Sequence, residues 1–318
     1  MYKQLLGGRF RFESDHAPLL DLVEAAYGGL PRHCLPDAGP EFRIELRLVE
    51  ERVLPAGTEP APVRIHSGAD LLCGVVDASN YVVIAPGQRR ALVVASEDML
   101  GFAYHLRYEL IEFAVFLLAA RGLGLVPLHG ACIGRHGRGV LLLGDSGAGK
   151  STLALHALLH GLDFLSEDAV FVQPESLLAT GVANYVHVKA DALRWVEDRP
   201  VRDWIGAAPI IRRRSGVEKF EADLRVGPGR LAPAPLRLVG AVFVSAMPAD
   251  DPARLLRAMP KQESLVRLQA DQPYAAAQPG WFPFQQRLVR LGTHELLRGA
   301  HPAAAVDSLC RLLDAADA

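Results

Sequence analysis

The feature that most constrains the fold of this chain is an eight-residue loop near its middle. An apolar segment at 140–143 precedes this loop, and a helical run at 152–159 follows it. The loop fits the pattern G-x-x-x-x-G-K-[ST] without deviation, and its residues are Gly144, Asp145, Ser146, Gly147, Ala148, Gly149, Lys150 and Ser151. A strand before the loop and a helix after it are the context that this pattern requires. The sequence therefore predicts an α/β core built around a phosphate-binding loop.

Each part of the loop has a chemical reason. Glycines allow consecutive backbone N–H groups to turn inward as an anion nest, and the following helix adds its positive N-terminal end. Lys150 is expected to reach the β- and γ-phosphates as a mobile charge, and Ser151 to supply a hydroxyl ligand to Mg²⁺. With Thr152 at the start of the helix, these residues predict binding of ATP and Mg²⁺. The alternative is a glycine-rich turn with an incidental lysine.

An acidic pair, Glu167 and Asp168, lies between two apolar strand-like runs at 162–165 and 169–172. In a phosphoryl-transfer site, a carboxylate at a strand end can hold Mg²⁺ or accept the proton of the acceptor hydroxyl. Neighbouring side chains of a regular strand point to opposite faces. Both carboxylates can therefore reach one phosphate only if the backbone turns between them. Asp163 is interpreted as a polar residue at a strand start.

Three blocks in this order resemble the core of the bacterial HPr kinase/phosphorylases and HPr-kinase-related proteins. They are His129-Gly130, the phosphate loop, and the segment 165–170, and the resemblance is strongest over about 125–175. It implies a P-loop α/β core related to phosphoenolpyruvate carboxykinases. It also implies transfer of the γ-phosphoryl group of ATP to a serine of a small carrier protein or, in related enzymes, of a lasso-peptide precursor.

The resemblance also implies roles for single residues. Asp168 matches the catalytic acid that serves as base towards the serine hydroxyl, and Glu167 stands where the family has a first Asp. His129 matches a histidine beside the active site, although a structural histidine bonded to backbone remains the alternative. The implied catalytic set is thus Asp168, His129 and Lys150, and the implied metal set is Ser151, Glu167 and Asp168.

The chain departs from the family in two places. Segment 185–191 stands where the family carries an Arg-Gly-x-Gly signature, and it lacks both glycines. Because that signature is linked to the phosphorolytic back reaction, we expect a plain kinase. Residues 1–120 do not resemble the regulatory domain of the carrier-protein kinases, so the resemblance does not identify the acceptor beyond a serine-bearing protein or peptide.

With 318 residues, the chain is long enough for two domains. We expect a β-rich α+β domain at 1–120 that recognises the partner or substrate, and a P-loop kinase domain at 121–318. Expected strands lie at 42–48, 63–66, 81–84 and 91–95, and a hairpin at 128–133 and 139–143; expected helices lie at 16–27 and 100–120, with a last amphipathic helix that buries Val306, Leu309, Cys310 and Leu313. Beyond 151, helices and strands are expected to alternate, with loops at 227–235 and 278–283.

Two further groups of residues have open interpretations. The cations at 212–214 and Lys219 support the transferring phosphoryl group, bind an acidic acceptor, or form a solvated face. The aromatic residues Trp281, Phe282 and Phe284 either line a peptide groove or pack under a loop.

Composition limits the function classes. A net charge of −2 gives no electrostatic case for nucleic acid or an anionic membrane. Four scattered cysteines fit a reducing cytosol, and neither an apolar signal nor a 20-residue apolar span occurs, so a cytoplasmic protein is expected. A homo-oligomer remains open. The alternatives to a serine kinase are a nucleotide-dependent regulatory or binding module and a small-molecule kinase acting on serine or a sugar.

Overall fold

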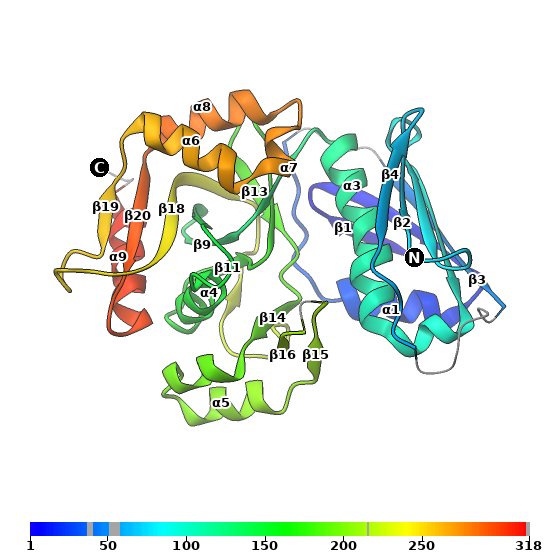
Figure 1. The fold of residues 1–318 in the computed structure, drawn as a ribbon, viewed down its shortest axis with the longest axis horizontal. Coiled ribbons are helices and arrows are strands. Elements are labelled where there is room, and N and C mark those ends of the chain that lie inside the picture. The colour runs from blue at the N-terminus through cyan, green and yellow to red at the C-terminus, as the bar shows by residue number, and fades with distance from the viewer. Residues whose placement is uncertain (37–40, 51–57, 215, 316–318) are drawn as a thin grey trace. The chain divides into compact units, whose positions relative to one another are not determined.

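The computed structural model describes residues 1–36, 41–50, 58–214 and 216–315 (Figure 1). The chain divides into two compact units, Met1–Leu125 and Val126–Ala318. The first unit extends a few residues past position 120 because helix α3 (Glu112–Gly122) packs on strands of that unit. Among the described residues, no helix combines the length and the apolar character needed to cross a lipid bilayer.

The described part of the first unit is built on a seven-stranded sheet. In sheet order its strands are β1 (Tyr2–Leu5), β2 (Gly8–Glu13), β3 (Glu41–Val49), β7 (Arg90–Ser96), β6 (Tyr81–Ala85), β5 (Leu71–Val75) and β4 (Arg64–Gly68). Strand β3 is parallel to both β2 and β7. It buries Phe42, Ile44 and Leu46 and leaves Arg43 and Arg47 exposed, as the alternation in the sequence predicts.

Helices of the first unit pack on its sheet. Helix α1 (Ala17–Tyr27) ends before Gly28, as expected. The prediction of one uniform helix at 100–120 is wrong in detail. Helix α3 is preceded by three shorter elements: 3-10 turns (η2, Glu97–Phe102), a short α2 (Ala103–His105) and π-helical turns (η3, Leu106–Ile111). Apolar side chains of η3 remain buried through this change of winding, so burial rather than a uniform pitch determines the segment.

The second unit contains a mixed ten-stranded sheet. Along its main path the strands are β17 (Arg230–Leu231), β11 (Asp163–Ser166), β9 (Ala131–Arg135), β10 (Arg138–Leu143), β18 (Leu236–Pro248), β13 (Leu178–Gly181), β12 (Ala169–Val172) and β8 (Val126–His129), with β20 (Thr293–Arg298) and β19 (Leu256–Ala258) attached to β18. A separate three-stranded sheet has the order β14 (Tyr185–Val188), β16 (Glu218–Asp223) and β15 (Ile210–Arg212).

Two apolar cores lie on the two faces of this mixed sheet. Alternate residues of β10 divide between them, with Val140 and Leu142 in one and Leu141 and Leu143 in the other. Helices α4 (Lys150–Leu159) and α9 (Pro302–Ala315) belong to the first core. Helices α6 (Lys261–Asp271) and α8 (Trp281–Leu291) cover the opposite face (Figure 1). The phosphate loop, which follows β10, is thus anchored between two packed layers.

Several expectations about the second unit are corrected. The run 128–133 is not one hairpin arm: Gly130 separates β8, which pairs with β12, from β9, which pairs with β10. A Cβ at Gly130 would lie 2.7 Å from the carbonyl oxygen of Leu142, so a larger residue does not fit there. Helices and strands also do not alternate strictly after 151, because β11, β12, β13 and β14 follow one another.

The expected loop at 278–283 is wrong at its end, because α8 begins at Trp281. Pro283 lies in the first turn of that helix, where a missing N–H costs no internal hydrogen bond. Trp281 and Phe284 are buried in the core, whereas Phe282 is exposed, which favours packing over a peptide groove. The loop at 227–235 contains only the two-residue strand β17.

Candidate active site

The phosphate loop has the geometry of an anion cradle. Gly144, Gly147 and Gly149 have φ values of 121°, 86° and 108°, which L side chains rarely adopt. A Cβ on Gly144 would also lie 2.6 Å from the carbonyl oxygen of Val244, whereas Gly147 and Gly149 face open space. Gly149 is the N-cap of α4 and has no side chain with which to satisfy the first amides of that helix. An anion bound at the loop could accept from these amides.

Lys150 is more enclosed than a mobile surface lysine. Lys150 is only 8% exposed. Its ammonium group donates to the carbonyl oxygens of Gly144 and Asp145, the latter at 3.1 Å. Burial lowers the pKa of Lys150, while nearby carboxylates, Asp271 and Asp168 among them, oppose that shift. A phosphate in the cradle would offer this ammonium a stronger partner than two neutral carbonyls.

The backbone bends at Glu167 and Asp168, the two residues between β11 and β12. The hydroxyl of Ser166 donates to the carbonyl oxygen of Ala169 at 2.7 Å, and the amide of Gly130 donates to the carbonyl oxygen of Asp168 at 3.1 Å. Because of this bend, the side chains of Glu167 and Asp168 need not point to opposite faces as in a regular strand. Both carboxylates consequently line the same cavity as the phosphate loop.

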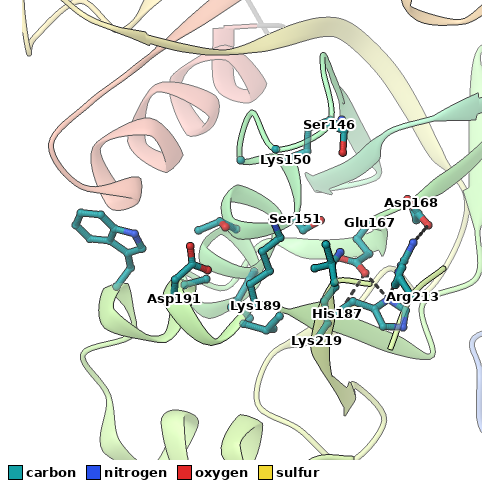
Figure 2. Close-up of a pocket in the computed structure, with 18 of the residues that line it drawn as sticks. Ser146, Lys150, Ser151, Glu167, Asp168, His187, Lys189, Asp191, Arg213 and Lys219 are labelled. Atoms are coloured by element: carbon teal, nitrogen blue, oxygen red, sulfur yellow. Dashed lines mark hydrogen bonds and ion pairs between the residues drawn. The ribbon is translucent and has the colours of Figure 1, made fainter. Parts of the chain in front are cut away.

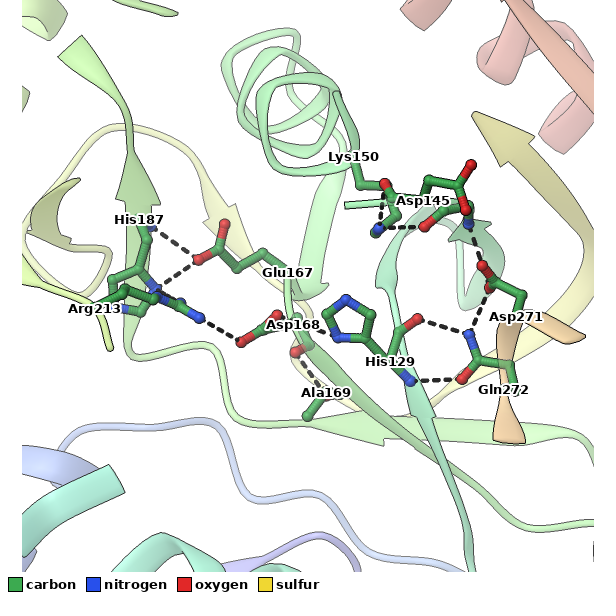
Figure 3. Close-up of polar contacts among 12 residues, drawn as sticks. His129, Asp145, Lys150, Glu167, Asp168, Ala169, His187, Arg213, Asp271 and Gln272 are labelled. Atoms are coloured by element: carbon green, nitrogen blue, oxygen red, sulfur yellow. Dashed lines mark hydrogen bonds and ion pairs between the residues drawn. The ribbon is translucent and has the colours of Figure 1, made fainter. Parts of the chain in front are cut away.

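Glu167 is held by a buried ionic network. Its Oε1 accepts from the backbone amide of His187 at 2.9 Å and lies 2.6 Å from Nδ1 of the same residue (Figure 3). On the other side, Nε2 of His187 lies 3.5 Å from Oε1 of Glu221. Burial alone would lower the pKa of His187, but hydrogen bonds to both glutamates outweigh it and raise that pKa.

Asp168 is more accessible than Glu167, with half of its side chain exposed. Its Oδ2 accepts from Nη1 of Arg213 at 3.3 Å, and its Oδ1 lies 3.4 Å from Nδ1 of His129 (Figure 3). Partial desolvation would raise the pKa of Asp168, but the positive field of Arg213 and His129 lowers it. Asp168 is therefore an ionised carboxylate that solvent or a second substrate can reach.

His129 is fixed through its backbone rather than through its ring. Its amide donates to Oε1 of Gln272 at 2.8 Å, and Nε2 of Gln272 donates back to its carbonyl oxygen at 2.9 Å. Nε2 of Gln272 also donates to Oδ2 of Asp271, which in turn accepts from the amide of Gly144 at 3.4 Å. The imidazole is 60% exposed, so the alternative of a buried structural histidine does not apply.

One cavity of about 330 Å³ brings most of the predicted residues together (Figure 2). The residues expected from sequence that line it are His129, Ser146, Gly147, Gly149, Lys150, Ser151, Thr152, Glu167, Asp168 and Lys219. Gly144, Asp145 and Ala148 form the loop behind this lining. Asp163 is buried away from it in an ion pair with Arg230, in keeping with a structural role.

Other lining residues were not singled out from sequence, and these include His187, Lys189, Asp191, Trp195 and Val217. His187 and Lys189 lie in the segment that replaces the family's glycine signature, and this position was the only available signal. Arg213 is the member of the run at 212–214 that lines the cavity. Lys219, on β16, is also partly buried there, and burial lowers its pKa. Neither residue therefore belongs to a purely solvated face.

The donor set fits a divalent cation bound together with a nucleotide. Within the described part of the chain, Oε2 of Glu167 is buried without a hydrogen-bond partner. Ser151 and Asp168 add a hydroxyl and a carboxylate to the same cavity. Hydroxyl and carboxylate oxygens together with phosphate oxygens are the ligands that Mg²⁺ prefers. The residues present therefore fit Mg²⁺.

Comparison with known proteins gives limited similarity. One curated protein, an HPr kinase/phosphorylase of Mycoplasmopsis pulmonis, is 39% identical over 61 residues, which are 19% of this chain and 20% of that protein. The chain thus matches about a fifth of the length of this relative. A solved HPr(Ser) kinase/phosphatase from Coxiella burnetii aligns with a TM-score of 0.27 at 15% identity, over 59% of this chain and 88% of that one. No family model matches. The curated match supports the resemblance to an HPr-kinase-like family.

Proposed function

We propose that this HPr-kinase-like chain is an ATP-dependent kinase that transfers the γ-phosphoryl group to a serine hydroxyl of a protein or peptide. One observation carries the proposal: an accessible, ionised carboxylate, Asp168, lies in the same cavity as a complete phosphate loop. A nucleotide sensor needs only the loop and a metal ligand, which Ser151 and the buried Glu167 would supply, whereas the exposed Asp168 can also accept a proton from an acceptor. This difference favours an enzyme over a binding module.

The loop would bind the phosphates of ATP. Amides at the start of α4 and the ammonium of Lys150 would neutralise the β- and γ-phosphates, and Lys150 would exchange its loop carbonyls for phosphate oxygens. Ser151, Glu167 and Asp168 are the residues that would hold Mg²⁺, which when bound neutralises charge on the transferring group. The buried network of His187 and Glu221 would keep Glu167 in position for this role.

Asp168 would act as the base. The serine hydroxyl donates its proton to a carboxylate oxygen of Asp168, the serine oxygen forms a bond to the γ-phosphorus, and the bond between that phosphorus and the bridging β-γ oxygen breaks. ADP leaves with the electron pair of the broken bond. Arg213, 3.3 Å from Asp168, keeps the carboxylate ionised before the proton arrives and supplies positive charge near the transferring group.

The two units would have separate tasks. Every phosphate-handling residue named above lies after position 128, so we assign chemistry to Val126–Ala318 and acceptor selection to Met1–Leu125. We assign only the forward reaction to this chain, because Tyr185–Val188 and the residues after it lack the glycine signature. Instead, this segment contributes His187 to the network that holds Glu167.

The experiment that tests the proposal follows the label of γ-labelled ATP. The protein, Mg²⁺ and labelled ATP are incubated with fractions of a lysate of its host, and modified species are identified by mass. We expect phosphoserine on one protein or peptide with the wild-type chain and none with Asp168→Asn. Label on free serine or a sugar would instead indicate a small-molecule kinase. Nucleotide binding without any labelled product would indicate a binding module.

A further inference from the structure

One end of the cavity contains residues that phosphoryl transfer does not use. The 3-10 helix η4 (Ala190–Trp195) contributes Asp191, Ala192 and Trp195 to this end, and the second turn of α4 contributes Leu155. Figure 2 shows Asp191 and Asp168 on opposite sides of the cavity, with Ser151 and Lys189 between them. The cavity therefore has a reacting end and a remote end.

The chemistry of the reacting end determines the direction of a bound nucleotide. Lys150 would bind the β- and γ-phosphates. Asp168 and Arg213 would lie beside the γ-phosphoryl group at the point where it reacts with its acceptor. The nucleoside is attached at the other end of the triphosphate. It must consequently leave the loop past Thr152 and Leu155, in the direction of η4.

The side chains of the two ends differ in kind. Three cations, Lys150, Arg213 and Lys219, face the part of the cavity that contains the two catalytic-site carboxylates. At the remote end, the opposite charges of Asp191 and Arg194 lie close together, and the partly exposed indole of Trp195 offers an apolar surface. An uncharged aromatic group fits this end better than an anion does.

The indole of Trp195 is held in one orientation by its neighbours. The ring of His301 meets it edge-on at a centroid distance of 5.5 Å and an interplanar angle of 80°. The guanidinium of Arg194 lies over the ring, 4.9 Å from its centroid. A ring fixed in this way loses little conformational entropy when a ligand stacks on it.

We propose that the purine base of the bound nucleoside triphosphate stacks on the indole of Trp195, with the nucleoside lying on the side of the cavity that contains Asp191. Purines offer the larger stacking surface, and stacking on an aromatic side chain contributes measurably to the binding of every base. The inference rests on the proposed function, because it takes its direction from phosphates bound at the loop.

The test compares two ligands that share phosphates and differ in the nucleoside. Binding of ATP and of inorganic tripolyphosphate, each with Mg²⁺, is measured by calorimetry for the wild type, Trp195→Ala and Trp195→Phe. We expect Trp195→Ala to weaken ATP about tenfold, or about 1.4 kcal/mol, and to leave tripolyphosphate unchanged. Trp195→Phe keeps a ring and should remain within about threefold of the wild type for both ligands. Equal affinity of the wild type and Trp195→Ala for ATP would overturn the inference.

A spectroscopic measurement keeps the test decisive if Trp195→Ala fails to fold. Tryptophan fluorescence of the wild type should change with ATP and not with tripolyphosphate, and Trp195→Phe, which retains Trp204 and Trp281, should lose that change. A change that persists in Trp195→Phe, or that both ligands produce equally, contradicts the inference. Wild type that binds ATP without involving Trp195 refutes this inference alone, whereas wild type that binds neither ligand refutes the proposed function as well.

Discussion

Replacing Asp168 by asparagine should separate nucleotide binding from transfer. The substitution keeps the shape of the side chain and removes the charge that Arg213 and His129 face. Because half of the Asp168 side chain is exposed, its ion pair with Arg213 is screened and contributes at most about 1 kcal/mol. ATP affinity should therefore change by no more than about fivefold, with an added effect only on the affinity for Mg²⁺.

The effect on transfer should be far larger. A positioned general base contributes about 10²–10⁴-fold, so single-turnover transfer by Asp168→Asn should fall by at least about a hundredfold at saturating ATP and Mg²⁺. Glu167→Gln is the matched control, because it removes the charge of the neighbouring carboxylate, which contacts His187. This variant should change the Mg²⁺ dependence more than the rate.

The measurement uses rapid quench with labelled ATP and the acceptor found in the lysate experiment, with ATP affinity measured by calorimetry. If Glu167→Gln is inactive and Asp168→Asn is nearly normal, the base has been assigned to the wrong acid. If neither substitution slows transfer, Asp168 has no role as a base and the mechanism is refuted.

Three further predictions concern other parts of the chain. Lys150→Ala should weaken ATP by at least about tenfold through loss of a charge-assisted contact, with a melting temperature within a few degrees of wild type; equal affinity by calorimetry would contradict the role of the loop. The fragment Val126–Ala318 should bind ATP but phosphorylate the acceptor slowly, and transfer at the full rate would refute the division of labour. His187→Gln should destabilise the fold by about 1.5–3 kcal/mol near pH 6, because it removes the imidazole that lies between the buried carboxylates of Glu167 and Glu221. Because the pKa of His187 is raised in the folded state, this stabilisation is complete below pH 6.5 and is lost as the pH rises through the folded-state pKa. The measurement compares the denaturation midpoints of the wild type and His187→Gln at pH 6 and pH 9. An equal difference between the two proteins at both pH values would show that the charge of His187 is irrelevant.

Local features of the second unit could be predicted from sequence because neighbouring residues determine them. Glycines at 144, 147 and 149 require unusual backbone angles, and the apolar run before them and the helical run after them define β10 and α4. The acidic pair could be placed between two strands, but its bend could not be predicted. That bend depends on the hydroxyl of Ser166 and on the amide of Gly130, which comes from another strand.

Long-range pairing accounts for the residues that were missed. His187 and Arg213 reach the cavity through the separate sheet of β14, β16 and β15, and no local pattern places that sheet beside the phosphate loop. Similarly, Gln272 reaches His129 across 143 positions of sequence. In the first unit the signal was present: β2 alternates Phe10 and Phe12 with arginines, yet the strand was not predicted.

The bonds that Asp271 and Gln272 make to Gly144 and His129 also bear on the order in which the protein matures. A ribosome that has just completed the phosphate loop must still synthesise more than a hundred residues before these two side chains exist. At about 5–20 residues per second, this interval lasts roughly ten seconds. During that interval the nascent chain carries the whole phosphate-binding motif without the contacts that hold its two flanks. The loop and the strand end at His129 therefore acquire these contacts only after residue 272 has been made.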